Sequence, residues 1–285
     1  MPRFHSQGTH ASRVILFIIL LLTTHMACAS IHKNIWPKWG AHNPLSQATI
    51  SHQEWQDFLT HHLTTNNEGI NLVDYAHLTE ADLDALNQYI TRMSTIEIDH
   101  YNRDEQLAFW LNLYNALTVQ ILADYYPVDS IQDISISPGL FSVGPWGAHL
   151  ITMHNTQLSL DDIQNHIIRP IWNDPRTHYA LNNATIGAAN LNKQAFQGTL
   201  IKDQLNEAAR GYINSLRGLQ IIDGQLIISK IYAWYSTDFG GSDVALIQHL
   251  SLYANEHLKT QLKGINTVNS YIYNWHLNNT IDESA

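Results

Sequence analysis

Cysteine is almost absent from this chain of 285 residues, because Cys28 is the only one. A single cysteine excludes an intramolecular disulfide, and it excludes a metal site built from several thiolates. Cys28 also lies in an N-terminal stretch that we expect to be removed. The mature chain should therefore contain neither a thiol nucleophile nor a thiolate ligand.

The hydrophobic run near the N-terminus is too short to cross a membrane. Residues 14–22 are nine apolar residues in a row, whereas a spanning helix needs about 20. The run follows two arginines and precedes the small residues 27–29, a pattern typical of a secretory signal segment. We therefore expect residues 1–29 to be cut before Ser30, which gives a periplasmic or secreted protein without stable membrane insertion. A retained anchor, or a lipid on Cys28, is the alternative.

Basic residues are few. The chain has 15 Lys and Arg against 25 Asp and Glu, a net charge of −10. Two of the 15 basic residues and no acidic residue fall within 1–29, so the remainder carries 13 against 25, or −12. No basic face can be assembled from this composition, which excludes nucleic acid as an expected partner and disfavours anionic membranes. The hydrophobic content of 45% is enough for one large core, so we expect a single globular domain at 30–285.

The motifs of several enzyme classes are also lacking. There is no H-E-x-x-H, no G-x-S-x-G and no glycine-rich phosphate loop. The histidines do not share a face at metal-ligand spacing. His61 and His62 are adjacent on a predicted helix and point roughly 100° apart. His149 and His154 fall on opposite sides of a predicted strand. We expect no metal and no cofactor.

Helix signals dominate the patterning that is present. Capping-box spacings open helices at Ser51, at Thr79 and at Ser159. The longest predicted helix, 102–126, is apolar nearly all round and should be the buried central one. The spacing predicts the following helices: 51–63, 79–93, 102–126, 159–169, 199–216 and 243–262. Apart from the central helix, the predicted helices 199–216 and 243–262 are the longest.

Strand signals are fewer and take the form of hairpins. Residues 146–159 should turn near Asn155, and 219–229 contains two apolar strands joined by Asp223-Gly224, a tight-turn signature. Residues 270–278 read as a closing strand. Helices with antiparallel hairpins, rather than regular strand–helix alternation, predict a helix-rich α+β fold.

The stretch THYALNNATIGAANL, residues 177–191, combines a short apolar run with amides and small residues. We expect a strand at 179–181. Asn182, Asn183 and Thr185 could then line a ligand site, because small residues let the backbone approach a ligand closely. A tight strand-to-helix turn is the alternative. His178 would be either a satisfied core residue or a base facing a cleft.

Two further pairs carry alternatives of the same kind. Asn112 and Asn115 lie three residues apart on the central helix and either tie down loop backbone or face a ligand. Lys230 and Asp238 are embedded among aromatic residues. They form either a buried ion pair or the charged handle of an aromatic-walled pocket.

Five motifs stand out in order along the chain: FWLNLYNALTVQIL, LSLDDIQNHIIRP, RTHYALNNATIGAANL, SKIYAWYSTDF and YIYNWHLN. Together they resemble the family called domain of unknown function 547, over about 55–278. The family has no assigned reaction to carry over. Its members read D-I-E-H where this chain has 162–165, N-C-A-S-x-G-C-P where it has 182–189, and Y-D-W where it has 273–275.

The departures from the family pattern all remove groups that ionise or react. A Glu, a His, two Cys and an Asp are replaced by Gln164, Asn165, Asn183, Ala188 and Asn274. If the family site uses a thiolate activated by a histidine and a carboxylate, the resemblance implies that this chain cannot perform that step.

We therefore expect a degenerate site, in which the segments 164–165 and 178–188 line a common concavity. The leading hypothesis is an exported, non-catalytic protein that binds a small polar ligand, neutral or cationic, or an envelope protein. One alternative is a hydrolase or transferase with His178 as general base. Another is a purely structural or interaction protein of the cell envelope.

Overall fold

The computed structural model describes residues 36–280. The predicted signal segment 1–29, the cleavage before Ser30 and Cys28 lie outside these residues. Within the described part of the chain, none of the helices combines the length and the apolar character that a membrane span requires.

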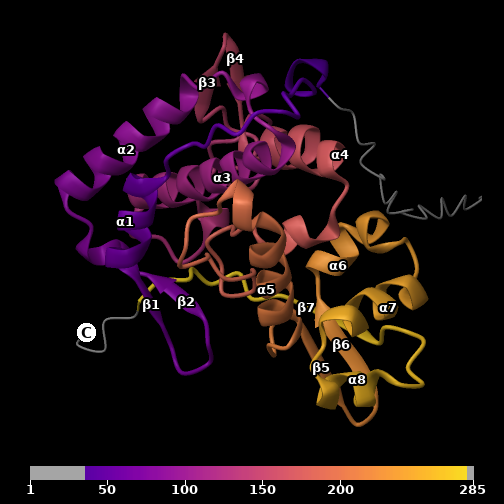
Figure 1. Cartoon of the computed structure of the whole chain (residues 1–285). Coiled ribbons are helices and arrows are strands. Elements are labelled where there is room, and N and C mark those ends of the chain that lie inside the picture. Colours follow the sequence, from indigo (N-terminus) through magenta and orange to yellow (C-terminus); the bar gives the residue numbers. More distant parts are fainter. Residues whose placement is uncertain (1–35, 281–285) are drawn as a thin grey trace, which may run out of the picture. The chain divides into compact units, whose positions relative to one another are not determined.

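Helix α3 (Arg103–Tyr125) is the centre of the first of two hydrophobic cores (Figure 1). Its first turn is capped by the Asn102 side chain, which accepts a hydrogen bond from the Glu105 backbone N–H at 3.0 Å. Every residue from Glu105 to Val119 is buried. A helix that is apolar nearly all round must be surrounded by protein, and the predicted central helix is confirmed.

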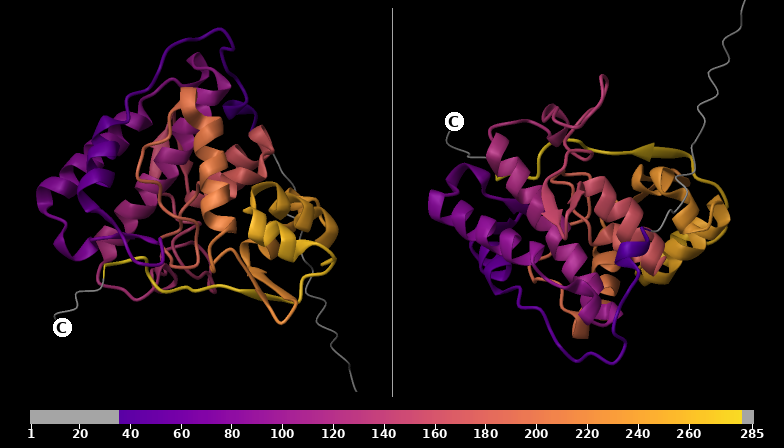
Figure 2. Two further views of the ribbon diagram at one scale, coloured as in Figure 1. Left: turned by 60° about the horizontal axis from the view of Figure 1, so that its bottom comes forward. Right: turned by 90° about the horizontal axis from the view of Figure 1, so that it is seen from above.

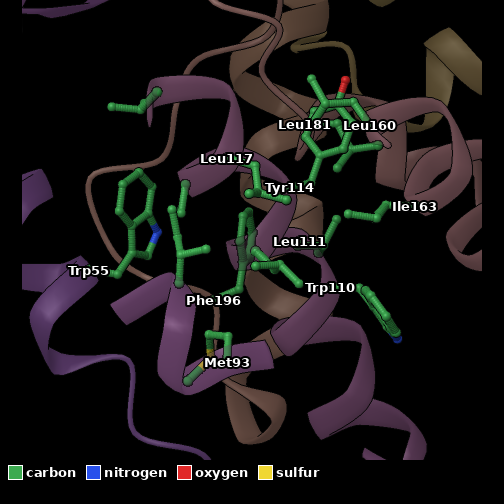
Figure 3. Packing of buried hydrophobic residues seen from close by; sticks show 14 of the residues in the cluster. Trp55, Met93, Trp110, Leu111, Tyr114, Leu117, Leu160, Ile163, Leu181 and Phe196 are labelled. Carbon is green, nitrogen blue, oxygen red and sulfur yellow. The ribbon is translucent and has the colours of Figure 1, made fainter. Parts of the chain in front are cut away.

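Two further helices, a hairpin and a π-helix surround α3. Thr79 and Asp82 form the predicted capping box of α2 (Glu80–Ser94), which packs Leu86, Tyr89 and Met93 inward. We call the buried cluster around α3 the α3 core; Figure 3 shows a part of its side chains. Its members include Trp55, Met93, Trp110, Leu111, Leu117, Leu160, Ile163, Leu181 and Phe196. The other elements around it are α1 (Gln53–His62), β3 (Ile151–Met153) and β4 (Thr156–Leu158).

The second core lies between short helices and a three-stranded sheet. We call it the sheet core; its members include Tyr179, Tyr212, Leu226, Ile228, Tyr232, Phe239 and Leu250. The helices that contribute to it are α5 (Ile201–Ile213), α6 (Ile231–Trp234), α7 (Asp243–Tyr253) and α8 (Glu256–Leu262). The strands are β5 (Leu219–Ile222), β6 (Gln225–Ser229) and β7 (Ser270–Ile272), in the order β5-β6-β7.

The hairpins form where the turn residues predict them. Asp223 and Gly224 both have positive φ, 51° and 77°, as the tight turn between β5 and β6 requires. The β3–β4 hairpin turns at His154 and Asn155. A third hairpin pairs β1 (Leu63–Thr65) with β2 (Asn71–Val73). The helix-rich α+β prediction is confirmed, although β7 pairs with β6 in parallel rather than as a hairpin.

The C-terminal segment 270–280 crosses from the sheet core to the α3 core (Figures 1 and 2). After β7, its Asn274 carbonyl accepts a hydrogen bond from the Gly187 N–H, and its Asn278 N–H donates to the Ala184 carbonyl. Val73 in β2 donates to the Asn278 carbonyl at 2.8 Å. A Cβ on Gly187 would lie 2.7 Å from the Asn274 nitrogen, so only glycine permits this approach.

The expected strand at 179–181 is wrong. Residues Pro175–Tyr179 form a 3-10 helix, and His178 lies in it rather than on a strand. Asp174 caps the turn through its side chain, which accepts from the Arg176 N–H at 2.9 Å. A capping aspartate followed by proline is a helix start, and it overrides the short apolar run.

The helix predicted to end at Arg169-Pro170 continues to Trp172. Its Ser159–Asp162 capping box is present, but residues Asp162–Ile168 wind as a π-helix before α4 (Arg169–Trp172). Pro170 offers no N–H to the preceding turn. The carbonyl of His166, in the turn before Pro170, accepts a hydrogen bond from the Trp36 N–H at 3.4 Å.

Two other boundaries differ from the prediction. The helix expected at 243–262 is broken into α7 and α8, because Asn255 caps a new helix by accepting from the Leu258 N–H at 2.9 Å. The capping box expected at Ser51 does not form. Helix α1 begins at Gln53, and Glu54 pairs with Arg92 instead.

Candidate ligand-binding cavity

A cavity of about 520 Å³ opens where the two cores meet. Its size falls within the roughly 300–1,000 Å³ of small-molecule sites. Tyr114 and Leu181 contribute from the α3 core, and Ile231 from the sheet core. The full lining is Tyr114, Ser137, Pro138, Ser142, Val143, Trp146, Gly147, Asp161, Gln164, His178, Leu181, Asn183, Ala188, Ile231, Trp234, Tyr235, Tyr273 and Trp275.

The stretch 177–191 follows the boundary between the cores. Tyr179 and Ala189 are buried in the sheet core, whereas Leu181 and Ala184 are buried in the α3 core. A chain that contributes side chains to two cores leaves backbone polar groups at their junction, where they need partners. This position explains why the stretch is rich in amides and small residues.

Three of the predicted site residues converge on this cavity. Gln164 from the π-helix, His178 from the 3-10 helix and Asn183 from the following loop all line it. Gln164 and the segment 178–188 therefore share a concavity as expected, whereas Asn165 is not among the residues that line it. Asn183 donates from Nδ2 to the Tyr273 hydroxyl at 2.9 Å. Thr185, which is buried, bonds to the same hydroxyl at 2.8 Å.

An aromatic surface, which we call the aromatic wall, forms one side of the cavity. It consists of Trp146, Trp234, Tyr273 and Trp275. The ring centroids of Trp234, Tyr273 and Trp275 are 4.7–5.4 Å apart, and Trp146 lies 6.0 Å from Trp275. Tilted rings at these distances are the favoured aromatic geometry. The C-terminal segment supplies two of the four rings, so its crossing builds the site.

Asp238 is the hub of a buried polar cluster behind the cavity. Its Oδ2 accepts from Arg169 Nε at 2.6 Å and bonds His178 Nε2 at 2.8 Å, and the side chains of Arg169 and Asp238 are 3% and 5% exposed. Burial raises the pKa of the Asp238 carboxyl, but the hydrogen bonds from His178 and Arg169 outweigh it and hold that pKa well below its usual value. Asp238 is therefore a carboxylate at neutral pH.

The same cluster fixes the orientation of the His178 ring. The imidazole stacks on Tyr235 with centroids 4.1 Å apart, and the Arg169 guanidinium lies 4.8 Å from the Tyr235 centroid. Asn165 accepts from Arg169 at 2.9 Å. Asn165 thus serves the buried cluster, while its neighbour Gln164 faces the cavity.

The predicted Lys230–Asp238 bridge is wrong. Lys230 is exposed, and its backbone N–H donates to the Ile272 carbonyl. Arg169, 69 residues away in sequence, supplies the cation that Asp238 needs. Proximity along the chain favoured Lys230, but α6 begins at the next residue and the Lys230 side chain remains in solvent.

Three of the predicted amides hold loop backbone. Asn112 bonds the N–H and the carbonyl of Phe196 at 2.9 and 2.8 Å. Asn115 donates to the Ala180 carbonyl and accepts from the Asn182 N–H, both at 2.9 Å. Asn182 accepts from the Ala184 N–H and donates to the Ala189 carbonyl. Buried amides that are satisfied in this way secure the loop against α3.

Asp161 is a cavity residue that the sequence prediction missed. Its side chain is exposed to the cavity, yet the surrounding protein, and next the charge of Asp162, raise the pKa of its carboxyl. Asn165 Nδ2 lies 3.4 Å from Asp161 Oδ1, a long contact. A signal was present in the sequence: of two adjacent aspartates after Ser159, only Asp162 is needed for the capping box.

Two hydroxyls that a histidine base could activate, those of Ser229 and Thr185, have other partners. Ser229 is fully buried, bonds the Tyr212 hydroxyl at 2.8 Å and accepts from the Ile231 N–H. Thr185 bonds Asn183 and Tyr273. Within residues 36–280, no three His, Cys, Asp or Glu side chains are grouped as they would be around a metal ion.

The model of one protein family, described as "Protein of unknown function, DUF547", matches residues 98–213. The predicted family resemblance is confirmed over these residues. The match includes Asp161, Gln164, His178 and Asn183, and it ends before the rings supplied by α6 and the C-terminal segment. We found no match to the chain among curated proteins or among solved structures.

Proposed function

We propose that this chain is a non-catalytic receptor for a small polar molecule, which binds in the cavity between the two cores. One observation carries the proposal. Two amides, Gln164 and Asn183, occupy cavity positions where the family pattern has a glutamate and a cysteine, and the aromatic wall lines the same cavity. Amides donate and accept hydrogen bonds without ionising, which suits recognition rather than nucleophilic attack.

We further propose that the protein acts outside the cytoplasm, after removal of residues 1–29. The composition of that segment supports this location. N-terminal sequencing of the protein from an osmotic-shock fraction tests the point, with a first residue near Ser30 as the expected result. An intact Met1, or Cys28 carrying a lipid in the membrane fraction, would contradict it.

A catalytic alternative has one specific observation in its favour. His178 lines the cavity, and its Nε2 lies 2.8 Å from the buried Asp238 carboxylate. A carboxylate that orients an imidazole is a common arrangement around a general base. On this alternative the protein is a hydrolase or transferase that activates water or a substrate hydroxyl.

Ligand-induced stabilisation distinguishes these functions. We expect the purified full-length protein to show a raised melting temperature with some members of a panel of small polar molecules, and to leave those molecules chemically unchanged. Trp234→Ala should abolish the shift, because Trp234 belongs to the aromatic wall. Tyr125→Ala is a matched control, since Tyr125 and Trp234 are similarly exposed, 45% and 43%. Turnover that is lost in His178→Ala would favour the catalytic alternative.

A further inference from the structure

We propose that the ligand is a small organic cation, a protonated or quaternary amine that contacts the aromatic wall and pairs with Asp161. The inference rests on the proposed function and specifies the ligand class of the same cavity.

The charges around the cavity favour a cation. Asp161 places a carboxylate on its surface, and among the described residues that line it there is neither a lysine nor an arginine. The nearest guanidinium of the polar cluster, that of Arg169, is neutralised by Asp238 at 2.6 Å. The chain as a whole has a net charge of −10. An anionic ligand would meet Asp161 and no lysine or arginine side chain of the lining, since the Arg217 guanidinium is held by the backbone carbonyls of Ile186 and Ala188, whereas a cation would be attracted to Asp161.

The aromatic wall provides the second half of such a site. The face of an aromatic ring carries partial negative charge, and tryptophan attracts cations most strongly. Trp146, Trp234 and Trp275 lie within one continuous surface together with Tyr273. Quaternary ammonium groups are recognised by such clusters, because they are poorly hydrated and can be surrounded by rings at small desolvation cost.

Asp161 is not required by the local fold, which leaves its carboxylate for a ligand. The adjacent Asp162 performs the capping of the π-helix, with its Oδ2 accepting from Ser159 N and Oγ at 2.9 and 2.8 Å. The contact of Asp161 with Asn165 is long, at 3.4 Å. A cation on Asp161 would also offset the enclosure that disfavours its ionised form.

Calorimetric titration with choline and with its uncharged isostere 3,3-dimethyl-1-butanol tests the inference. We expect the full-length protein to bind choline at least tenfold more tightly, a difference of about 1.4 kcal/mol. Asp161→Asn should weaken choline binding about tenfold and leave the isostere unaffected. Asp203→Asn is the control, because Asp203 is an exposed aspartate on α5.

Two outcomes would overturn the cation assignment. Equal affinity for choline and the isostere, with both lost in Trp234→Ala, would show an aromatic cavity that does not select charge, and the proposed receptor function would stand. Failure of choline, tetramethylammonium and ethanolamine to bind, while a neutral polar molecule stabilises the protein, would have the same meaning. If no molecule of either kind binds, the receptor function itself fails.

Discussion

The two cores of this protein are held together differently. The α3 core is built mainly from aliphatic and aromatic side chains, and its buried amides, such as Asn112, bond to backbone. The sheet core contains a chain of buried hydroxyls. Tyr212 and Ser229 bond each other at 2.8 Å, and the Tyr179 hydroxyl lies 2.8 Å from His249 Nε2. The buried amides of the first core therefore hold backbone, whereas the buried hydroxyls of the second bond to other side chains.

The cavity lies where the α3 core and the sheet core meet. On one side, tight apolar packing leaves no room for water. Between the cores, Asp161, Gln164 and Asn183 present polar atoms to the cavity. The stretch 177–191 joins the two, since it contributes Tyr179 to one core and Leu181 to the other. Matched substitutions in the two cores test whether the cores differ in this way.

The largest effect should come from the α3 core. Trp110 is 1% exposed and packs edge-on against Trp39 and Phe109. Trp110→Ala should lower the free energy of unfolding by about 3–5 kcal/mol, because it removes apolar contact and leaves a cavity. Urea unfolding measures the change. Trp172→Ala, at a partly buried tryptophan packed against the same core, should cost clearly less; an equal cost would contradict the attribution of the larger loss to full burial.

Removing the charge of Asp238 should cost about 3 kcal/mol, because it leaves the buried Arg169 guanidinium without its counter-ion. Urea unfolding of Asp238→Asn provides the measurement. In the double variant Arg169→Met/Asp238→Asn, part of the loss should be recovered, since neither charge then remains buried. A double variant that is less stable than the single one would mean that the pair itself, rather than the orphaned charge, stabilises the fold.

Acid should weaken both cores through a histidine–tyrosine pair in each. His52 Nδ1 lies 2.7 Å from the Tyr89 hydroxyl in the α3 core, and His249 Nε2 bonds Tyr179 in the sheet core. Burial lowers the pKa of each histidine to about 4. The unfolded chain, with a histidine pKa near 6.5, then binds more protons than the folded one as the pH falls.

The contribution of these histidines to stability is therefore present above about pH 6.5 and lost as the pH falls through about 4. For His52 the loss should reach roughly 3 kcal/mol below that range. Unfolding curves between pH 7 and 4 measure it. His52→Gln should flatten the dependence of the α3 core, and His249→Gln that of the sheet core. A stability independent of pH in this window would show that neither histidine is held neutral by burial.

A smaller effect is expected from one hydroxyl of the sheet core. Tyr212→Phe keeps the ring and removes the hydroxyl that donates to the Gly187 carbonyl and bonds Ser229 Oγ. We expect a loss of about 1–2 kcal/mol in the free energy of unfolding, because the buried Gly187 carbonyl and the Ser229 hydroxyl each lose a partner. Tyr89→Phe gives the matched change in the α3 core. Equal and negligible costs would remove the distinction between a packed core and a hydrogen-bonded one.

Sequence patterns within a few residues predicted most helices and turns. The features that these patterns did not predict depend on tertiary contacts. The Thr79 capping box, the apolar α3 and the Asp223-Gly224 turn depend on neighbours within a few residues, and all three are present. The π-helix before Arg169 could not be read in this way, since its start resembles that of an α-helix.

The site was predictable to the extent that the family pattern marked its residues. Gln164 and Asn183 share a cavity as expected. The pairing of Asp238 with Arg169 joins residues 69 apart, and the aromatic wall gathers rings from a loop, α6 and the C-terminal segment. Such contacts depend on how the two cores are placed, which no spacing in the sequence encodes.

The smallest change in stability should follow Asn183→Cys, which restores a cysteine of the family pattern. The substitution removes the hydrogen bonds that the Asn183 side-chain amide makes with the hydroxyls of Tyr273 and Thr185. These two hydroxyls still bond each other at 2.8 Å, so neither is left without a partner. We expect a loss of under about 1 kcal/mol in the free energy of unfolding.

The new thiol also reports on the cavity. The only native cysteine of the chain is Cys28. When it is replaced in a Cys28→Ser background, alkylation of the Asn183→Cys variant measures the accessibility of position 183 alone. Because Asn183 is half-buried and lines the cavity, we expect slow but complete labelling by a small maleimide. Choline should slow it further, since a bound cation between Asp161 and the aromatic wall covers that position. A thiol that never reacts would mean that the cavity is closed in solution, and a protein with no accessible cavity could not be the receptor proposed for it.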